Sequence, residues 1–102
     1  MIARTPEEIA LLRESGKRLA THVRTLAAMV KPGITPAQLE DAAHAMVEKD
    51  GDTLAFLGYR SHGEKHGYPS ALCISNNDAI VHGAASQQHD PIQEGDIVSV
   101  DF

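Results

Sequence analysis

Two helix-start signals constrain this chain most, because they fix where its first half becomes helical. Thr5 is followed by proline and then by Glu8, and Thr35 is followed by proline and then by Gln38. In this pattern the threonine hydroxyl caps the first turn, and the residue three places later bonds back to the cap. Proline fits the first helical position, where its missing amide costs nothing. The chain is therefore predicted to open with two helices.

Apolar residues recur at three- and four-residue spacings after each start signal. The first series runs to a stop at Lys31-Pro32-Gly33, and the second runs to Gly51. The two predicted stripes consist of Ile9, Leu12, Leu19, Val23, Leu26 and Val30, and of Leu39, Ala42, Ala43, Met46 and Val47. Both helices are amphipathic and need an apolar surface to pack against.

After Gly51 the pattern changes to short apolar runs that predict strands. Thr53–Phe56 and Ala71–Ser75 are two such runs, and the Gly- and His-rich residues 57–70 separate them. Residues 76–78, Asn-Asn-Asp, are typical of a turn, so we expect residues 71–75 and 79–82 to form a hairpin.

The final run, residues 97–102, alternates with the period of two that is typical of a strand. One face holds Val98, Val100 and Phe102, and the other holds Ile97, Ser99 and Asp101. Strands that follow two helices without crossover helices predict an α+β fold, with both helices on one face of a mostly antiparallel sheet. The outer edge of the last strand is expected to be uncovered, which makes it a docking or aggregation site.

Charge and composition narrow the partners. The 102 residues carry a net charge of −5 with scattered Lys and Arg, so neither nucleic acid nor a membrane surface is an expected partner. The single Cys73 fits a reducing compartment, and we expect a cytoplasmic protein. The first residues contain no long apolar run, so no signal peptide or membrane span is predicted. We expect one small domain, residues 1–102.

Six histidines raise the question of a metal site. One candidate group lies at every second position of a glycine-containing loop and consists of His62, Glu64 and His66. These residues do not share one face of a helix, which the helical zinc motif requires. The histidines that we interpret as structural or solvated are His22, His44 and His89.

Three other residues are candidates for chemistry, and their structural interpretations stay open. His82 ends an apolar run and precedes Gly83, so a rigid strand would hold its imidazole while the backbone turns sharply beyond it. Cys73 is either a small buried apolar residue, which is the more common case, or a nucleophile. Asp101 is costly on an apolar strand unless a cation, a metal ion or loop amides satisfy its carboxylate.

Two segments together carry a family resemblance. Residues 67–83, GYPSALCISNNDAIVHG, and residues 92–102, IQEGDIVSVDF, closely resemble the amino-terminal half of type I methionine aminopeptidases. Residues 4–17, RTPEEIALLRESGK, and residues 30–40, VKPGITPAQLE, look like the first two helices of that family. The resemblance covers essentially the whole chain.

The resemblance implies the pita-bread fold, in which two pseudo-symmetric α+β halves enclose two divalent metal ions (Co, Mn, Fe, Zn or Ni). Two Asp, one His and two Glu hold that pair in the family. Asp101 matches the first metal-binding Asp, and the chain ends before the other ligands. Residues 1–102 therefore resemble a partial peptidase domain, which we expect to be inactive alone.

The resemblance also implies substrate-binding roles. His82 matches the histidine beside the scissile amide, where it is expected to bind substrate and assist catalysis. The residues that match the methionine pocket are Cys73, Tyr59, Tyr68 and Phe56, with His66 at the rim. A thiol and aromatic edges suit the soft thioether of methionine.

The implied function is metal-dependent removal of the initiator methionine from nascent peptides, with the ribosome as a partner of the full-length form. The alternatives are a non-catalytic binding module of the same fold, or another aminopeptidase such as a proline-directed one. Three features depart from the family pattern: an insertion at residues 60–65 that leaves the role of Tyr59 and the pocket mouth open, Asn76 in place of an apolar residue, and Ala84-Ala85 in place of Ile-Pro.

Overall fold

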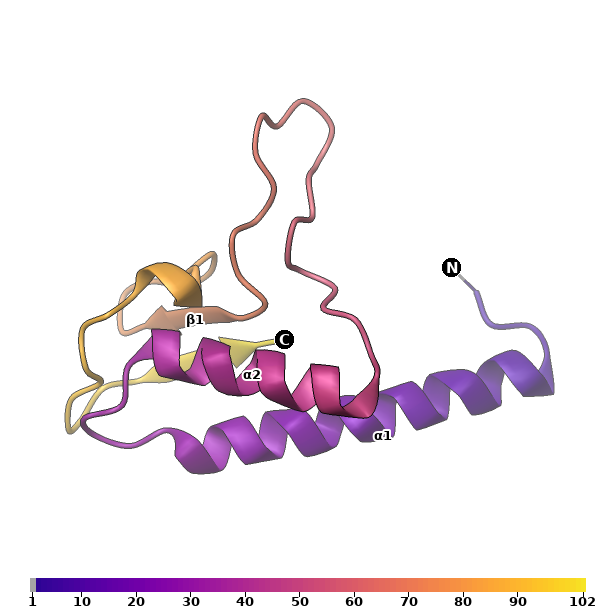
Figure 1. The fold of residues 1–102 in the computed structure, drawn as a ribbon, viewed down its shortest axis with the longest axis horizontal. Helices are drawn as coiled ribbons and strands as arrows, with labels where there is room; N and C mark the ends of the chain where they lie inside the picture. The colour runs from indigo at the N-terminus through magenta and orange to yellow at the C-terminus, as the bar shows by residue number, and fades with distance from the viewer. Residues whose placement is uncertain (1) are drawn as a thin grey trace.

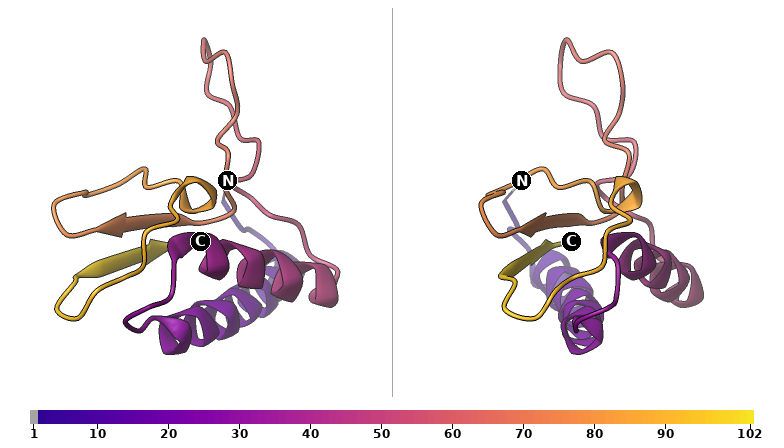
Figure 2. Two further views of the ribbon diagram at one scale, coloured as in Figure 1. Left: turned by 60° about the vertical axis from the view of Figure 1, so that its left-hand side comes forward. Right: turned by 90° about the vertical axis from the view of Figure 1, so that its left-hand side faces the viewer.

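A computed structural model describes residues 2–102. Its elements in chain order are helix α1 (Pro6–Met29), helix α2 (Pro36–Asp50), strand β1 (Cys73–Asn76), the short 3-10 helix η1 (Ala85–Gln87) and strand β2 (Val98–Asp101). The two helices lie side by side on one side of the two strands (Figures 1 and 2). Residues 57–68, which we call the arm, belong to the long loop that rises away from the body between α2 and β1 (Figure 1).

Both predicted helix starts are confirmed. Ahead of α1, the Thr5 hydroxyl accepts the Glu8 amide at 3.2 Å, and the Glu8 carboxylate accepts the Thr5 amide at 3.0 Å. Thr35 and Gln38 make the same pair of bonds ahead of α2, at 3.2 and 2.9 Å. The end of α2 is also confirmed, because Gly51 follows it in a left-handed conformation, with φ of 72°.

The core lies between the helices and the sheet. It joins Leu26 of α1 to residues of α2 and to Leu72 and Ile74 at β1, all without exposed surface. The members from α2 are Leu39 and Ala43. The predicted α+β arrangement, with helices on one face of an antiparallel sheet, is confirmed.

The predicted hairpin is wrong, because β1 pairs with the distant β2 instead of residues 79–82. The antiparallel register places Cys73 opposite Asp101 and Asn76 opposite Val98. Residues 79–82 form a loop. The chain pairs with β1 on that side only after this loop, through an isolated bridge between Cys73 and Ala84 that is flanked by backbone bonds of Gly83 and Ala85. The run Thr53–Phe56 also lies in a loop. The described sheet therefore has two strands and not several.

Asn77 explains why the turn after β1 is joined to the start of β2 and does not form a hairpin with residues 79–82. Its backbone has φ of 56°, and its side-chain carbonyl accepts the Ile97 amide at 3.1 Å. Its side-chain amide donates to the Asp96 carboxylate at 3.0 Å. These bonds join the turn to the start of β2, so the turn residues organise a nonlocal pairing.

The alternation of the last strand is confirmed. Val98, Val100 and Phe102 are half-buried, whereas Ser99 and Asp101 are exposed. The half-buried face packs toward the helices, and the exposed face looks away from them.

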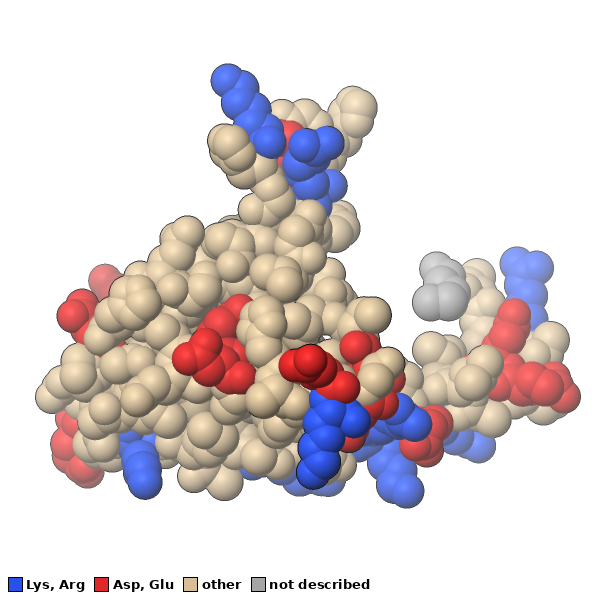
Figure 3. Space-filling model, viewed as in Figure 1, with Lys and Arg blue, Asp and Glu red and all other residues tan. Residues whose placement is uncertain are grey.

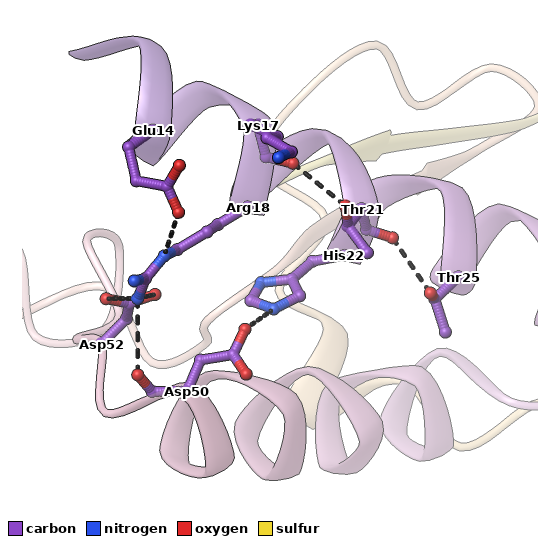
Figure 4. A network of polar contacts seen from close by, with 8 residues as sticks. All are labelled: Glu14, Lys17, Arg18, Thr21, His22, Thr25, Asp50 and Asp52. Carbon is purple, nitrogen blue, oxygen red and sulfur yellow. Dashed lines mark hydrogen bonds and ion pairs between the residues drawn. The ribbon is translucent and has the colours of Figure 1, made fainter. Parts of the chain in front are cut away.

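A polar network joins the middle of α1 to the end of α2 (Figure 4). The buried His22 contacts the Asp50 carboxylate at 2.9 Å, and the Phe102 ring lies 6.1 Å from the His22 ring. Arg18 pairs with Glu14 and Asp52, each at 3.2 Å. The interpretation of His22 as a structural residue agrees with these contacts and with its burial.

The first half of α1 extends beyond the rest of the fold (Figure 1). Its stripe residues Ile9, Leu12 and Leu19 are 40%, 49% and 42% exposed, whereas Leu26 of the same stripe is fully buried. We call residues 6–19 the uncovered half of α1. No helix within residues 2–102 is long and apolar enough to cross a membrane.

Candidate functional site

A cleft with a volume of about 560 Å³ lies between the arm and the sheet. All seven residues singled out by the sequence line it, namely Phe56, Tyr59, His66, Tyr68, Cys73, His82 and Asp101. They come from the arm and its base, from both strands and from the loop after β1. The fold therefore gathers residues that are up to 45 positions apart, since Phe56 and Asp101 are the outermost of the seven.

The floor of the cleft is built by the register of the two strands. Cys73 and Asp101 are direct cross-strand partners, so their side chains leave the same face of the sheet. Cys73 is 9% exposed, and Asp101 is exposed. Because Asp101 is exposed, water can solvate its carboxylate in this structure, and a metal-binding role of this residue stays a prediction.

His82 is held by its backbone and not by a strand, which corrects the sequence interpretation. It has φ of 64°, and its amide donates to the Cys73 sulfur at 3.1 Å. The next residue, Gly83, accepts the Ile74 amide at 2.7 Å, and its own amide donates to the Ser75 hydroxyl at 3.2 Å. A Cβ on Gly83 would lie 1.8 Å from the Ile74 carbonyl oxygen, so this close approach requires glycine.

Tyr68 is one of the aromatic residues that line the cleft. Its ring meets the Phe56 ring edge-on at 6.2 Å and 88°, and its hydroxyl donates to the Leu72 carbonyl at 3.3 Å. Burial first, and then the contact with Cys73 and the charge of nearby carboxylates, raises the pKa of Tyr68 to about 12. The phenol is therefore neutral at physiological pH and keeps the proton that it donates to the Leu72 carbonyl.

Backbone hydrogen bonds hold the base of the arm together, where its two ends, at residues 58–59 and at residue 68, lie side by side. The Gly58 amide donates to the Tyr68 carbonyl at 2.8 Å, and the Tyr68 amide donates to the Tyr59 carbonyl at 2.7 Å. Beyond this ladder the arm adds Ser61 and Glu64 to the lining of the cleft. The sequence marked residues 60–65 as an insertion that left the form of the pocket mouth open, and the structure places Ser61 and Glu64 of this insertion in the lining.

Glu40 is the supporting residue that sequence reasoning missed. This carboxylate on α2 is 4% exposed and accepts the Ala71 amide at 2.6 Å and the Leu72 amide at 2.9 Å. His44 contacts it at 3.0 Å. These bonds fix the segment that enters β1 just before Cys73. The available signal was the position of Glu40 three residues before Ala43 on the buried stripe.

The described residues do not by themselves fit a metal centre. Within residues 2–102, no three His, Cys, Asp or Glu side chains gather closely enough to hold a metal ion. Asp101 offers one carboxylate, whereas protein metal sites generally combine several ligands.

Comparison with known proteins gives one consistent result. Residues 10–102 match the metallopeptidase family M24. The methionine aminopeptidase of Aquifex aeolicus is 42% identical over 95 residues, which cover 93% of this chain and 36% of that protein. Methionine aminopeptidase 1 of Bacillus subtilis is 32% identical over 102 residues, which cover 100% of this chain and 38% of that protein.

Solved structures of methionine aminopeptidases show the same correspondence. The structure from Rickettsia prowazekii matches with a TM-score of 0.84 and 29% identity. The match covers 99% of this chain and 38% of the Rickettsia chain. The structure from Thermotoga maritima has a TM-score of 0.78 and 33% identity, with coverage of 98% and 38%. The chain thus spans a little over a third of the length of these relatives.

Proposed function

Because this chain belongs to the metallopeptidase family M24, we propose that it forms the methionine-binding part of a methionine aminopeptidase. The complete enzyme would remove the initiator methionine from nascent polypeptides. The observation that carries the proposal is the convergence on one cleft of every residue that the family resemblance assigns to the site.

The inner cleft has the chemistry that a methionine side chain needs. The Cys73 thiol and the edges of the Phe56 and Tyr68 rings offer soft, polarisable contacts to a thioether. Val81, which also lines the cleft, adds an aliphatic surface. In this proposal the side chain of the first substrate residue lies among these four groups.

His82 is proposed to contact the peptide group that follows the first residue. Its imidazole is exposed, and the Cys73 sulfur and the glycine turn at Gly83 fix its backbone. A neutral imidazole can donate one hydrogen bond, so it can bind a substrate carbonyl and stabilise charge that develops on that oxygen.

Family M24 comprises metallopeptidases, and the resemblance makes Asp101 one carboxylate ligand of a divalent ion. The family pair requires further Asp, His and Glu ligands, and no three-ligand group occurs in residues 2–102. We therefore assign no hydrolytic step to these residues, and we propose that the 102-residue chain binds a methionine-initiated peptide without cleaving it.

A titration followed by ¹⁵N NMR tests this binding role. The chain is titrated with the tripeptides Met-Ala-Ser and Gln-Ala-Ser, which differ in the polarity of the first side chain. The expected result is selective movement of the Cys73, Tyr68 and His82 amide signals with the methionine peptide. Equal movement with both peptides, or none near the cleft, would contradict the methionine pocket.

Metal binding and turnover are measured on the same samples. Calorimetry with Mn²⁺ is expected to show no tight site, and the peptide assay no release of methionine. Tight binding together with turnover would refute the assignment of these residues as an incomplete centre.

A non-catalytic peptide-binding module of the same fold is the second candidate, and the presence of Asp101 and His82 at the positions that match the family site weighs against it. The two candidates differ in a chimera that joins residues 1–102 to the remaining carboxy-terminal part of the Aquifex aeolicus relative. A peptidase part predicts metal-dependent methionine release that Asp101→Asn abolishes. A binding module predicts peptide binding without release in the same folded chimera.

A further inference from the structure

The cleft extends beyond the groups that a methionine side chain uses. Its inner part holds Cys73, Phe56 and Tyr68, whereas Ser61 and Glu64 line it from the arm. A volume of about 560 Å³ falls within the range of about 300–1,000 Å³ that accommodates a ligand much larger than one side chain. The outer part is therefore available to the rest of a peptide.

The base of the arm is held in one conformation by backbone contacts. The backbone ladder joins Gly58 and Tyr59 to Tyr68 across the two ends of the arm. The two ends also approach very closely, because a Cβ on Gly67 would lie 2.6 Å from the Gly58 carbonyl oxygen. The arm projects from the body beside the sheet (Figure 1). A peptide that leaves the inner cleft on this side follows the arm.

The charges along the lining favour a basic ligand. Glu64 and Asp101 are its carboxylates, and no Lys or Arg is among the described lining residues. The Ser61 amide donates to the Glu64 carboxylate at 2.8 Å, which restricts where that carboxylate points. Arg60 and Lys65 belong to the same arm but not to the lining, and basic side chains gather near the arm tip (Figure 3).

We propose that the arm is a specificity element that binds an extended peptide beyond its second residue and that Glu64 selects a basic side chain there. The placement of the first residue in the inner cleft rests on the proposed function. The selection by Glu64 goes beyond it, because residues 60–65 are the insertion that departs from the family pattern.

The test uses the 102-residue chain and three peptides, Met-Ala, Met-Ala-Lys-Ala-Ser and Met-Ala-Glu-Ala-Ser, in ¹⁵N NMR titrations at low salt. Met-Ala is expected to move the inner amides of Cys73 and His82 and to leave the arm amides of Ser61 and Glu64 in place. The lysine peptide moves both sets. It binds about two- to fivefold more tightly than the glutamate peptide, as expected for one exposed charge pair.

Two variants assign the preference to the arm. Glu64→Gln removes the difference between the two pentapeptides, whereas the control Glu94→Gln, an exposed glutamate outside the lining, retains it. A variant that lacks residues 60–65 keeps the Met-Ala response and loses the preference. The conservative Glu64→Gln change keeps the test valid if this deletion fails to fold.

The outcomes separate the two proposals. Movement of the inner amides without the arm amides overturns the specificity role and leaves the proposed function standing. Movement of the arm amide signals without the inner amide signals overturns the methionine pocket. It also overturns the proposal that the peptide runs from the inner cleft outward along the arm. Equal affinities for the two pentapeptides overturn the role of Glu64.

Discussion

Replacement of Glu40 by glutamine tests whether this buried carboxylate holds the entrance to β1. The carboxylate is 4% exposed, and its two oxygens accept the Ala71 and Leu72 amides separately, at 2.6 and 2.9 Å. Glutamine keeps one acceptor oxygen but turns an NH₂ group toward the other amide. Two donors then face each other in a buried place.

The magnitude follows from the bond that is lost. A hydrogen bond to a charged group contributes about 1.5–3 kcal/mol, and a buried amide without a partner costs about 1–3 kcal/mol. Because these contributions overlap, the free energy of unfolding is expected to fall by about 2–4 kcal/mol for Glu40→Gln. A domain of this size has a total of about 5–15 kcal/mol, so the loss is a large fraction.

Urea unfolding followed by far-ultraviolet circular dichroism measures the change, with Glu48→Gln as the control on the exposed part of the same helix. The control is expected to change the free energy of unfolding by no more than about 0.5 kcal/mol. Hydrogen exchange at the Ala71 and Leu72 amides is expected to accelerate only in Glu40→Gln. A loss below about 1 kcal/mol with unchanged exchange at both amides would refute the reasoning, since two charge-assisted bonds cannot be so weak.

Three further predictions concern backbone fit and titration. Gly83→Ala is expected to destabilise the fold by about 3 kcal/mol or more, because its Cβ would meet the Ile74 carbonyl. The control Gly16→Ala in α1 has open space around its Cβ and is expected to stabilise the fold by about 0.5–1 kcal/mol. Similar urea midpoints for the two variants would contradict this difference. Backbone amides lower the pKa of Glu8 below 4.5, so its stabilising contribution is present above that value and is lost as pH falls through the folded-state pKa. Circular dichroism during acid titration should show a loss of helix that Glu8→Gln reduces, and identical curves would contradict the capping role. In an ultraviolet titration, one tyrosine should ionise near pH 12, and the transition should disappear in Tyr68→Phe; its persistence would contradict the assignment to Tyr68.

The helices could be predicted from the sequence because their causes are local. The capping pairs lie three residues apart, and Gly51 ends α2 by its own backbone preference. The wrong hairpin has a nonlocal cause, since the bonds of Asn77 to residues about 20 positions away favour pairing with β2. No local pattern reports such a bond.

The candidate site divides in the same way. The family resemblance identified the residues of the inner cleft, and the fold brings them together around one cavity. The position of Glu40 on the buried stripe of α2 was a sequence signal for its burial, but its bonds to the amides before β1 depend on how that helix packs. The places of Ser61 and Glu64 in the lining likewise depend on where a loop packs in three dimensions. Burial and cleft lining are tertiary properties, and one residue's neighbours in sequence carry little information about them.

The uncovered half of α1 makes one continuous helix into two units of local stability. Residues near Leu26 are held by the core, whereas residues 6–19 depend on their capping box, on contacts within the helix and on the exposed ion pair between Arg18 and Asp52. Helical segments of that length are marginal in water without tertiary support. Amide exchange should therefore slow progressively from the first turn toward Met29, and the helix should fray from its amino-terminal end well below the temperature at which the core unfolds.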